Sequence, residues 1–482
     1  MLFNSIDFAI FLPLVFAFYW FLSKYDIKYQ NIFLVIASYI FYGWWDFRFL
    51  SLLFFSSIVD FLIGLSLKNE TNIKKRKFYL AISLTVNLGL LGFFKYFNFF
   101  IDNFVKAFTI FGFKIDARHL NIVLPVGISF YTFQTLSYSI DVYKKKLEPT
   151  EDFFSFLAFV SFFPQLVAGP IERASNLLPQ FYKKRVFDYS NGVDGLKQML
   201  WGFFKKLVIA DNCAKIVDQV FSNLPSYSGS SIFIASIFFA FQIYGDFSGY
   251  SDIAIGTAKL FGFNLMTNFL YPYFSRDIAE FWRRWHISLS TWFRDYVYIP
   301  LGGSKKSILR NILNTLIVFL VSGFWHGASW NFILWGLINA LYFLPLLLLK
   351  KNRKNIEIIA YNKIFPSFNE ILSVILTFIT VCFAWIFFRS NTIGNLSICI
   401  SKIFSKSLFT YPKIMKLDDI NMTIIFIIIM NLFEYFSRKE SYGLAFINKL
   451  SPIVRYSIYV MLILCIGLFM QASKTAFIYF QF

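Results

Sequence analysis

The sequence is poor in charged residues, histidine and cysteine, and each shortage narrows the class of protein. Only 15% of the 482 residues are charged, and no hydrophilic run is long enough for a second domain, so we expect one domain over residues 1–482. The four cysteines are scattered without metal-ligand spacing, which argues against a disulfide framework and predicts no metal site. The chain shows no internal repeat and no nucleic-acid-binding module, so nucleic acid is not an expected partner.

Apolar and aromatic residues dominate instead, at 57% and 22% of the sequence. Such a composition is typical of a polytopic membrane protein. The apolar runs are continuous, which favours helices over an alternating β-barrel and predicts an all-α fold. The predicted spans or re-entrant segments are Phe8–Leu22, Asn31–Trp45, Phe49–Leu67, Phe78–Phe94, Ile122–Ile140, Phe153–Gly169, Ser231–Gly245, Ile312–Phe324, Trp330–Leu349, Ile371–Phe388, Met422–Phe436 and Tyr456–Ala472.

Basic residues between these runs predict the topology. The formal net charge is +19, and lysines cluster after the first and third runs. The positive-inside rule places those two linkers in the cytoplasm, with the N-terminus and the C-terminus outside. The segments Phe94–His119 and Leu196–Ile209 mix basic and aromatic residues, so we expect them to lie in the membrane interface.

The stretch Phe281–Asn331 contains two of the three histidines, His286 and His326. Residues 279–298 are predicted to form one helix, with an aromatic stripe on one face and a basic face beside it. His286 falls at the border of the two faces. Arg283, Arg284 and Arg294 on or near the basic face could hold a phosphorylated cofactor such as coenzyme A, or they could serve as ordinary lipid anchors.

Polar residues also follow the Ser231–Gly245 run. Asp246 and Asp252, together with Gln242, could line a polar tunnel, or the carboxylates could pair structurally with arginines of the central stretch. The position of both carboxylates near the end of a span leaves the two interpretations open.

His326 is the sharper candidate, because an ionisable side chain is costly at membrane depth and usually has a function there. Gly323 and Gly327 permit a tight turn or close backbone approach, and Asn331 offers a nearby polar partner. The alternative is a buried histidine that a carbonyl group satisfies. A serine hydrolase is not supported, since no G-x-S-x-G elbow occurs.

Several motifs together resemble one known family. DFSGYSD at residues 246–252, FWRRWHISLSTWFRDYVYIPLGG at 281–303 and FWHG at 324–327 are similar to the membrane-bound O-acyltransferase family. LPVGISFYTFQ at 124–134 and AGPIERA at 168–174 match the same bacterial branch, which includes alginate O-acetyltransferase, peptidoglycan O-acetyltransferase and the teichoic acid D-alanyl transfer protein. The likeness covers nearly the whole chain.

The resemblance implies a fold of roughly 10–13 membrane helices around a central tunnel, with interfacial and re-entrant helices besides. It implies transfer of an acyl group from a cytoplasmic thioester, with acetyl-CoA as donor and no permanently bound cofactor. His326 matches the near-invariant family histidine and would be the general base. His286 matches a second family position, and we expect Trp325 and Asn331 beside the histidine to contact substrate.

The expected function is therefore O-acetylation of an envelope polysaccharide, either an alginate-like exopolysaccharide or peptidoglycan, by a bacterial inner-membrane protein. An extracytoplasmic partner of the SGNH esterase-like type is expected to complete the transfer. The alternatives are an acyltransferase for teichoic acid, protein or lipid acceptors, and a transporter of lipid-linked sugar, although the repeats typical of transporters are missing.

Four of the six residues in FIYFQF, at 477–482, are aromatic. On physical grounds such a tail is an interfacial anchor. The tail also resembles the end of a small membrane peptide that works with the D-alanyl transfer protein. By that resemblance, Tyr479 is a candidate acyl relay, which would receive the acetyl group with help from His326 and pass it outward.

Overall fold

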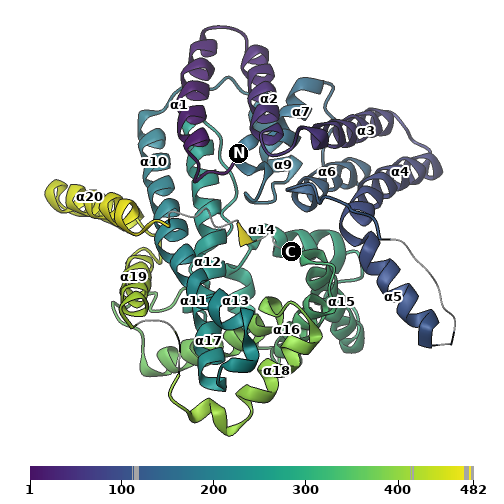
Figure 1. Ribbon diagram of the computed structural model, residues 1–482. Coiled ribbons are helices and arrows are strands. Elements are labelled where there is room, and N and C mark those ends of the chain that lie inside the picture. The colour runs from purple at the N-terminus through teal and green to yellow at the C-terminus, as the bar shows by residue number, and fades with distance from the viewer. Residues whose placement is uncertain (111, 113–118, 413, 415–416, 472–476, 479–482) are drawn as a thin grey trace. The chain divides into compact units, whose positions relative to one another are not determined.

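The protein is described by a computed structural model that covers residues 1–110, 112, 119–412, 414, 417–471 and 477–478 (Figure 1). Every regular element within these residues is helical. The chain forms two compact units, Met1–Gly195 with Thr257–Met266, and Leu196–Gly256 with Thr267–Phe482. Tyr479 lies outside the described residues, and a single domain over the whole chain stays a prediction.

The first unit is built from apolar helices that begin at polar caps. Ser5, Asp26, Asn72 and Asp152 each accept hydrogen bonds from backbone N–H groups in the first turn of the helix that follows. The helices are α1 (Ile6–Phe21), α2 (Ile27–Gly43), α3 (Leu50–Lys68), α4 (Ile73–Leu91), α5 (Phe97–Ile110), α6 (Ile128–Tyr143), α7 (Phe153–Ser161), α8 (Phe163–Leu166), α9 (Ala174–Leu177) and the start of α10 (Tyr189–Phe203).

Three of these helices meet at one buried carboxylate. Asp60 of α3 accepts hydrogen bonds from Ser83 and Asn87 of α4, at 2.5 and 2.8 Å, and from Ser139 of α6 at 2.8 Å. The Asp60 side chain is fully buried. A buried carboxylate is tolerated only when its acceptor atoms are satisfied, so this cluster fixes the three helices against one another.

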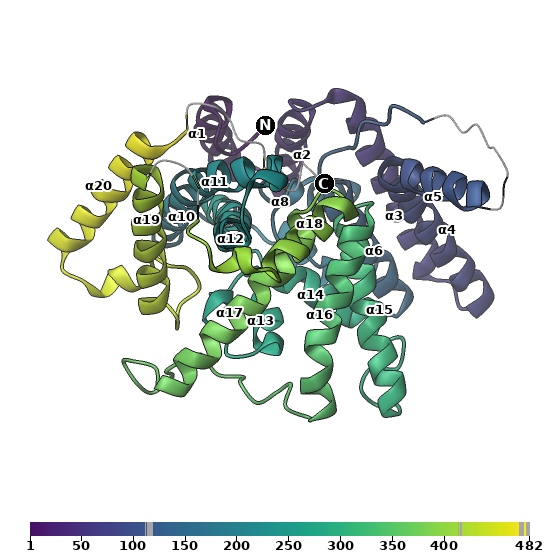
Figure 2. The same cartoon turned by 60° about the horizontal axis from the view of Figure 1, so that its bottom comes forward.

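The second unit contains the long helix α12 and most of the remaining helices. They are α11 (Asp211–Ser222), α12 (Gly229–Leu260, which ends in the first unit), α13 (Ile278–Arg284), α14 (Ile287–Phe293), α15 (Ile308–His326), α16 (Trp330–Leu348), α17 (Phe368–Arg389), α18 (Ile393–Ile403), α19 (Leu417–Phe436) and α20 (Pro452–Phe469). Helices α15 and α16 lie side by side, and α20 lies at the edge of this unit (Figures 1 and 2).

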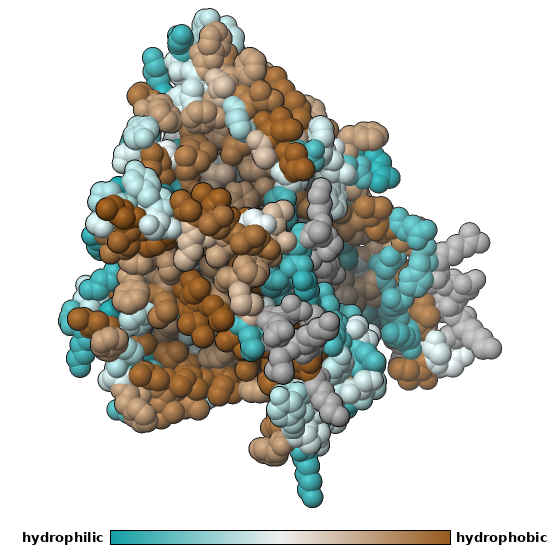
Figure 3. Space-filling model, turned by 60° about the vertical axis from the view of Figure 1, so that its left-hand side comes forward, coloured by the Kyte–Doolittle hydropathy of each residue, from teal (hydrophilic) through white to brown (hydrophobic). Residues whose placement is uncertain are grey.

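The all-helical membrane class is confirmed, since eight helices of the described residues are long and apolar enough to cross a bilayer. Many of their large apolar side chains are exposed, as on α1, α17 and α20. Figure 3 shows hydrophobic side chains over wide areas of one face. The predicted spans Asn31–Trp45 and Ile122–Ile140 correspond to α2 and α6, which have 17 and 16 residues, and α6 is almost wholly buried by protein.

Three predicted element boundaries are wrong. The fourth helix runs on through a π-helical turn at Gly92–Tyr96 into α5, so Ile73–Ile110 is one continuous helical stretch and not a span followed by a separate interfacial helix. Helix α12 continues past Gly245 to Leu260, which places Asp246 and Asp252 within a helix instead of at its end. The predicted helix over 279–298 breaks at Trp285 and His286.

The break has a clear backbone cause. His286 has φ 43° and ψ 54°, a left-handed conformation that ends α13 and serves as the N-cap of α14. The N–H of Ile287 then donates to the carbonyl oxygen of Asn268 at 2.9 Å, instead of to the preceding helical turn. The aromatic and basic stripes of the sequence therefore do not run along one helix.

Leu196–Ile209 does not present the exposed basic face on which its predicted interfacial position rests. It covers the end of α10 and a π-helical segment, Phe204–Ala210, whose Lys205 and Lys206 are buried. Glycines allow the close packing that brings these lysines to α12, since a Cβ on Gly245 would lie 2.9 Å from the carbonyl oxygen of Lys205. Buried carboxylates, not lipid headgroups, are therefore the partners of both lysines.

Candidate active site

His326 is the last residue of α15 and is 4% exposed. Its imidazole packs edge-on against the rings of Trp335 and Phe388, with centroid distances of 5.1 and 5.3 Å. The predicted close approach around it is confirmed, because a Cβ on Gly323 would collide with the carbonyl oxygen of Phe332. The α15–α16 pair thus fixes an imidazole at a helix end inside an aromatic cage.

His286 is 1% exposed and lies in the same unit. Its Nδ1 is 3.1 Å from the side-chain oxygen of Asn268, and its ring meets the ring of Phe247 at a right angle, with centroids 4.6 Å apart. Burial lowers the pKa of this imidazole to about 3, so it is neutral at physiological pH. The residue lies between two short helices, outside the eight candidate spans.

Trp325 is close to both histidines. Its ring centroid is 6.1 Å from that of His286 and 5.0 Å from that of His326. The structure therefore brings the two predicted imidazoles against one indole ring. Asn331, by contrast, donates from its side-chain nitrogen to the carbonyl oxygen of Ser390 and caps the contact between α16 and the end of α17.

The carboxylates of α12 are paired with lysines rather than with the arginines of the central stretch. Lys205 Nζ is 2.6 Å from Asp252, and Lys206 Nζ is 2.7 Å from Asp246 and 2.9 Å from Asp211. Gln242 is buried one helical turn before Asp246 on the same helix. Opposite charges in this arrangement satisfy one another, which is the condition for burying them.

Asp246 also binds the C-terminal segment. The backbone N–H of Ile478 donates to its carboxylate at 2.7 Å, and both Phe477 and Ile478 are 2% exposed. The ring of Phe477 packs against those of Tyr250 and Phe247, at 4.9 and 6.0 Å between centroids. Phe247 also contacts His286, so one aromatic ring links Phe477 to that histidine.

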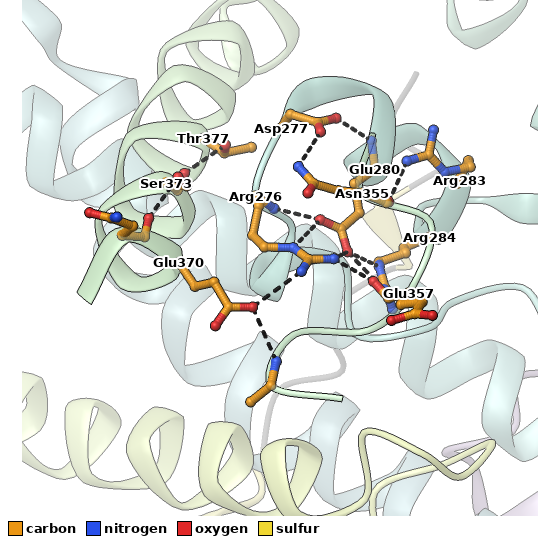
Figure 4. Close-up of polar contacts among 12 residues, drawn as sticks. Arg276, Asp277, Glu280, Arg283, Arg284, Asn355, Glu357, Glu370, Ser373 and Thr377 are labelled. Carbon is orange, nitrogen blue, oxygen red and sulfur yellow. Dashed lines mark hydrogen bonds and ion pairs between the residues drawn. The ribbon is translucent and has the colours of Figure 1, made fainter. Parts of the chain in front are cut away.

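Two of the three arginines predicted to bind the donor belong to a structural network (Figure 4). Arg284 pairs with Glu280 at 2.8 Å, and Arg276 pairs with Glu280 and Glu370 at 3.0 and 3.2 Å. Arg283 donates to the carbonyl oxygens of Asn352 and Asn355, at 2.8 and 2.7 Å. This network ties α13 to α17 and to the loop before it.

Arg294 differs, because it lines a cavity of about 670 Å³ within the second unit. The cavity has apolar walls that include Trp282 and Phe319, and basic residues from several segments line it besides: Lys306, Lys350 and Arg353. Ser322, one turn before His326 on α15, also lines it. The volume is in the range of small-ligand sites, and the basic side chains suit a phosphorylated molecule.

Sequence reasoning missed Asn268 and the two lysines. Asn268 lies in the loop between α12 and α13, where no motif singles it out. The sequence predicts an interfacial segment with a basic face around Lys205 and Lys206. Only the distances from these lysines to the carboxylates in the fold identify them as members of buried ion pairs. Gly245 and Gly249, which are four residues apart on α12 and pack against the Lys205–Lys206 backbone, were the available signal of close helix packing.

These features describe a helical membrane protein with two buried histidines in one unit, and comparison with known proteins shows its class. Residues 150–390 match the model of the membrane-bound O-acyltransferase family. The probable alginate O-acetylase AlgI of Pseudomonas aeruginosa is 37% identical over 396 residues, 82% of this chain and 73% of that protein. The peptidoglycan O-acetyltransferase of Helicobacter pylori is 37% identical over 424 residues, 82% of this chain and 78% of that protein.

A more distant relative is the teichoic acid D-alanyltransferase of Bacillus subtilis, 27% identical over 285 residues, 56% of this chain and 70% of that protein. The chain belongs to the membrane-bound O-acyltransferase family. It is a multi-pass membrane enzyme that transfers acyl groups, and the predicted family is confirmed.

Proposed function

We propose that the protein transfers acetyl groups from cytoplasmic acetyl-CoA across the bacterial inner membrane, for O-acetylation of an alginate-like exopolysaccharide or peptidoglycan. The names of the two relatives at 37% identity support this acceptor class. The observation that carries the proposal is the cavity with basic lining residues that reaches Ser322, one helical turn from His326. A charged carrier can stay at the basic residues while its acyl end approaches the imidazole.

His326 is the proposed general base. It would take the proton of an attacking hydroxyl while the oxygen bonds to the thioester carbonyl carbon, and the carbon–sulfur bond would then break to release the thiol. The substitution His326→Ala should abolish acetate ester on the polymer while the protein remains inserted and abundant. A normal ester content in that variant would contradict the assignment.

Tyr479 is the proposed hydroxyl. The burial of Phe477 and Ile478 beside Asp246 supports this role, since the two residues immediately before the tyrosine are anchored within the unit that contains both histidines. The phenol ester formed would be a reactive donor, because phenolate is a good leaving group. Tyr479→Phe keeps the aromatic ring and should stop polymer acetylation as completely as His326→Ala. Full activity in Tyr479→Phe would make the tail an anchor only.

The donor site is proposed to include Arg294 and not Arg283 or Arg284. Charge removal in Arg294→Gln should weaken acetyl-CoA binding about tenfold, since charged hydrogen bonds contribute about 1.5–3 kcal/mol. Arg283→Gln is the matched control in the structural network. It should affect stability more than donor affinity, and an equal loss of affinity in both variants would reject the cavity as the donor site.

The steps outside the membrane are proposed because acetyl-CoA is cytoplasmic whereas the envelope polysaccharide is extracytoplasmic. An extracytoplasmic SGNH-type partner would take the acetyl group to the polysaccharide, and both termini of this chain would face outward. A reporter fused after residue 482 should be active only on the outer side, and a cytoplasmic signal would overturn the predicted topology.

A further inference from the structure

Asn268 makes a convergent set of buried contacts beside His286. Its side-chain oxygen lies 3.1 Å from His286 Nδ1, 3.3 Å from the backbone nitrogen of Ser288 and 2.8 Å from the Ser288 hydroxyl. Its side-chain nitrogen donates to the hydroxyl of Ser251 at 3.2 Å. Asn268 and Ser288 are fully buried, so water does not replace any of these contacts.

The orientation of the Asn268 amide follows from one of these contacts. A backbone N–H can only donate, so the atom facing the nitrogen of Ser288 must be the amide oxygen. The amide nitrogen then faces Ser251, which accepts its hydrogen bond. The oxygen has lone pairs and no hydrogen, so the Nδ1 atom of His286 must carry the proton in their shared hydrogen bond.

The consequence for the other ring nitrogen is direct. The His286 imidazole is neutral, as its pKa of about 3 indicates, so a proton on Nδ1 leaves a lone pair on Nε2. Nε2 is buried, and among the described residues it has no hydrogen-bond partner. The rings around the imidazole belong to Phe247, Phe269 and Trp325, none of which presents an acceptor to it.

We propose that Asn268 is a positioning residue that holds His286 in the Nδ1–H tautomer, so that Nε2 presents a lone pair, and not an N–H group, to the substrate. A nitrogen with a lone pair cannot donate to the thioester carbonyl oxygen. His286 therefore accepts a hydrogen bond from the substrate, at a group other than the hydroxyl hydrogen that His326 removes, and it does not stabilise the oxyanion. The role of this hydrogen bond rests on the acyl transfer proposed above, whereas the tautomer is a property of the protein alone.

The left-handed backbone at His286 is consistent with this role. A non-glycine residue at φ 43° is uncommon, and such conformations persist where surrounding contacts over-determine them. Here the carbonyl oxygen of Asn268 accepts from the N–H of Ile287 while its side chain holds His286 and Ser288. Asn268 thus fixes both the left-handed backbone of His286 and the orientation of its imidazole ring.

The tautomer can be measured without an activity assay. The chain has three histidines, so ¹⁵N-histidine labelling of the full-length protein in lipid gives three imidazoles, which His119→Gln and His326→Gln assign. We expect His286 to show a protonated Nδ1 and an unprotonated Nε2 at neutral pH. Asn268→Leu should lose this single tautomer. A protonated Nε2 in the wild type, or an unchanged spectrum in Asn268→Leu, would overturn the proposal.

Activity measurements separate positioning from packing. Asn268→Leu should lower kcat/KM about 100-fold, the low end of what a positioned acid–base group contributes. Asn339→Leu makes the same exchange at a buried amide of α16 that bonds within its own helix, and it should stay within a few-fold of wild type. Equal losses in the two variants would reduce Asn268 to a packing residue.

A conservative variant adds a pH test. Asn268→Asp keeps an acceptor oxygen for Nδ1–H, and its charge favours the imidazolium, so the acid limb of the rate profile should move to higher pH. An unmoved acid limb with full activity would contradict the contact. If the wild type acetylates no acceptor at all, the proposed function fails, yet the labelled-histidine spectrum still decides the tautomer.

Discussion

Gly323 of α15 and Phe332 of α16 are in backbone contact, so that a Cβ on the glycine would overlap the carbonyl oxygen of the phenylalanine. The contact is reciprocal, since a Cβ on Gly336 would overlap the carbonyl oxygen of Phe319. Small residues let membrane helices approach this closely, and overpacking costs about 1–3 kcal/mol. His326 lies one turn further along α15, so this packing also sets its position.

Gly323→Ala should therefore lower the thermal stability of the purified protein and reduce acetylation, because it separates α15 from α16. Gly467→Ala in α20 is the matched control, since nothing lies within 4 Å of a Cβ there. It should be neutral or slightly stabilising, because alanine favours a helix over glycine by about 1 kcal/mol. Equal stability of the two variants would show that α15 and α16 do not pack through these glycines.

Asp60 is expected to be a structural centre of the first unit. Asp60→Leu leaves the donors of Ser83, Asn87 and Ser139 without their buried acceptor, which should destabilise the protein by about 3 kcal/mol or more. Asp60→Asn should cost less, because serine hydroxyls can turn to donate or accept. Denaturation in detergent measures both. Ser66→Ala, at an exposed position of the same helix, should stay near wild type. We therefore expect the largest loss of stability in Asp60→Leu, a smaller loss in Asp60→Asn and almost none in Ser66→Ala. Equal denaturation midpoints in the three variants would contradict this order.

Because Phe477 and Ile478 are buried, we expect a cysteine at position 478 to be protected from labelling. In a Cys465→Ser background, Ile478→Cys should react slowly with a maleimide, because the side chain is buried and the backbone is bonded to Asp246. Adding Asp246→Ala should raise the labelling rate about tenfold, since a hydrogen bond to a charged group contributes about 1.5–3 kcal/mol. Tyr411→Cys, at an exposed position, should react rapidly with or without Asp246→Ala. Fast labelling of Ile478→Cys alone would contradict the docked segment.

Acid should destabilise the protein through His286. Burial lowers the pKa of this group from 6.5 to about 3, so between those values the unfolded chain binds a proton that the folded chain does not. Stability therefore falls as pH drops below about 6.5, by about 2 kcal/mol at pH 5 for this one group. His286→Gln should show a smaller loss between pH 7 and 5 than wild type. His119→Gln, at an exposed position, should retain the wild-type loss, and identical slopes in all three proteins would reject the assignment.

The class of the protein could be predicted from its sequence because composition and long apolar runs report membrane helices directly. His326 could be predicted too, since a lone imidazole in apolar sequence is conspicuous. The helix over 279–298 could not, because its periodicity continues through His286, and neither glycine nor proline marks the left-handed residue. That conformation depends on Asn268, which is distant enough in sequence to leave no local pattern.

The partners of several basic residues could not be predicted, for a related reason. Arg283, Arg284, Lys205 and Lys206 look like surface cations when each is judged with its neighbours in sequence. Their partners are carboxylates or carbonyl groups elsewhere in the fold. Of the three arginines predicted to bind the donor, Arg294 lines a cavity that a phosphorylated molecule could enter, and its ion pair with Asp295 is exposed to solvent. The sequence shows which residues carry a charge, whereas burial and ion pairing in the fold decide which of those charges are available to a ligand.

The bond between Ile478 and Asp246 also has a consequence for the order of folding. It joins residues 232 positions apart, so the chain between them must close a long loop before the bond can form. Contacts of such high sequence separation form after local helical contacts, because the entropy of loop closure opposes them. Residues 477 and 478 would then dock against helices that have already packed, and their docking would be the final step of folding.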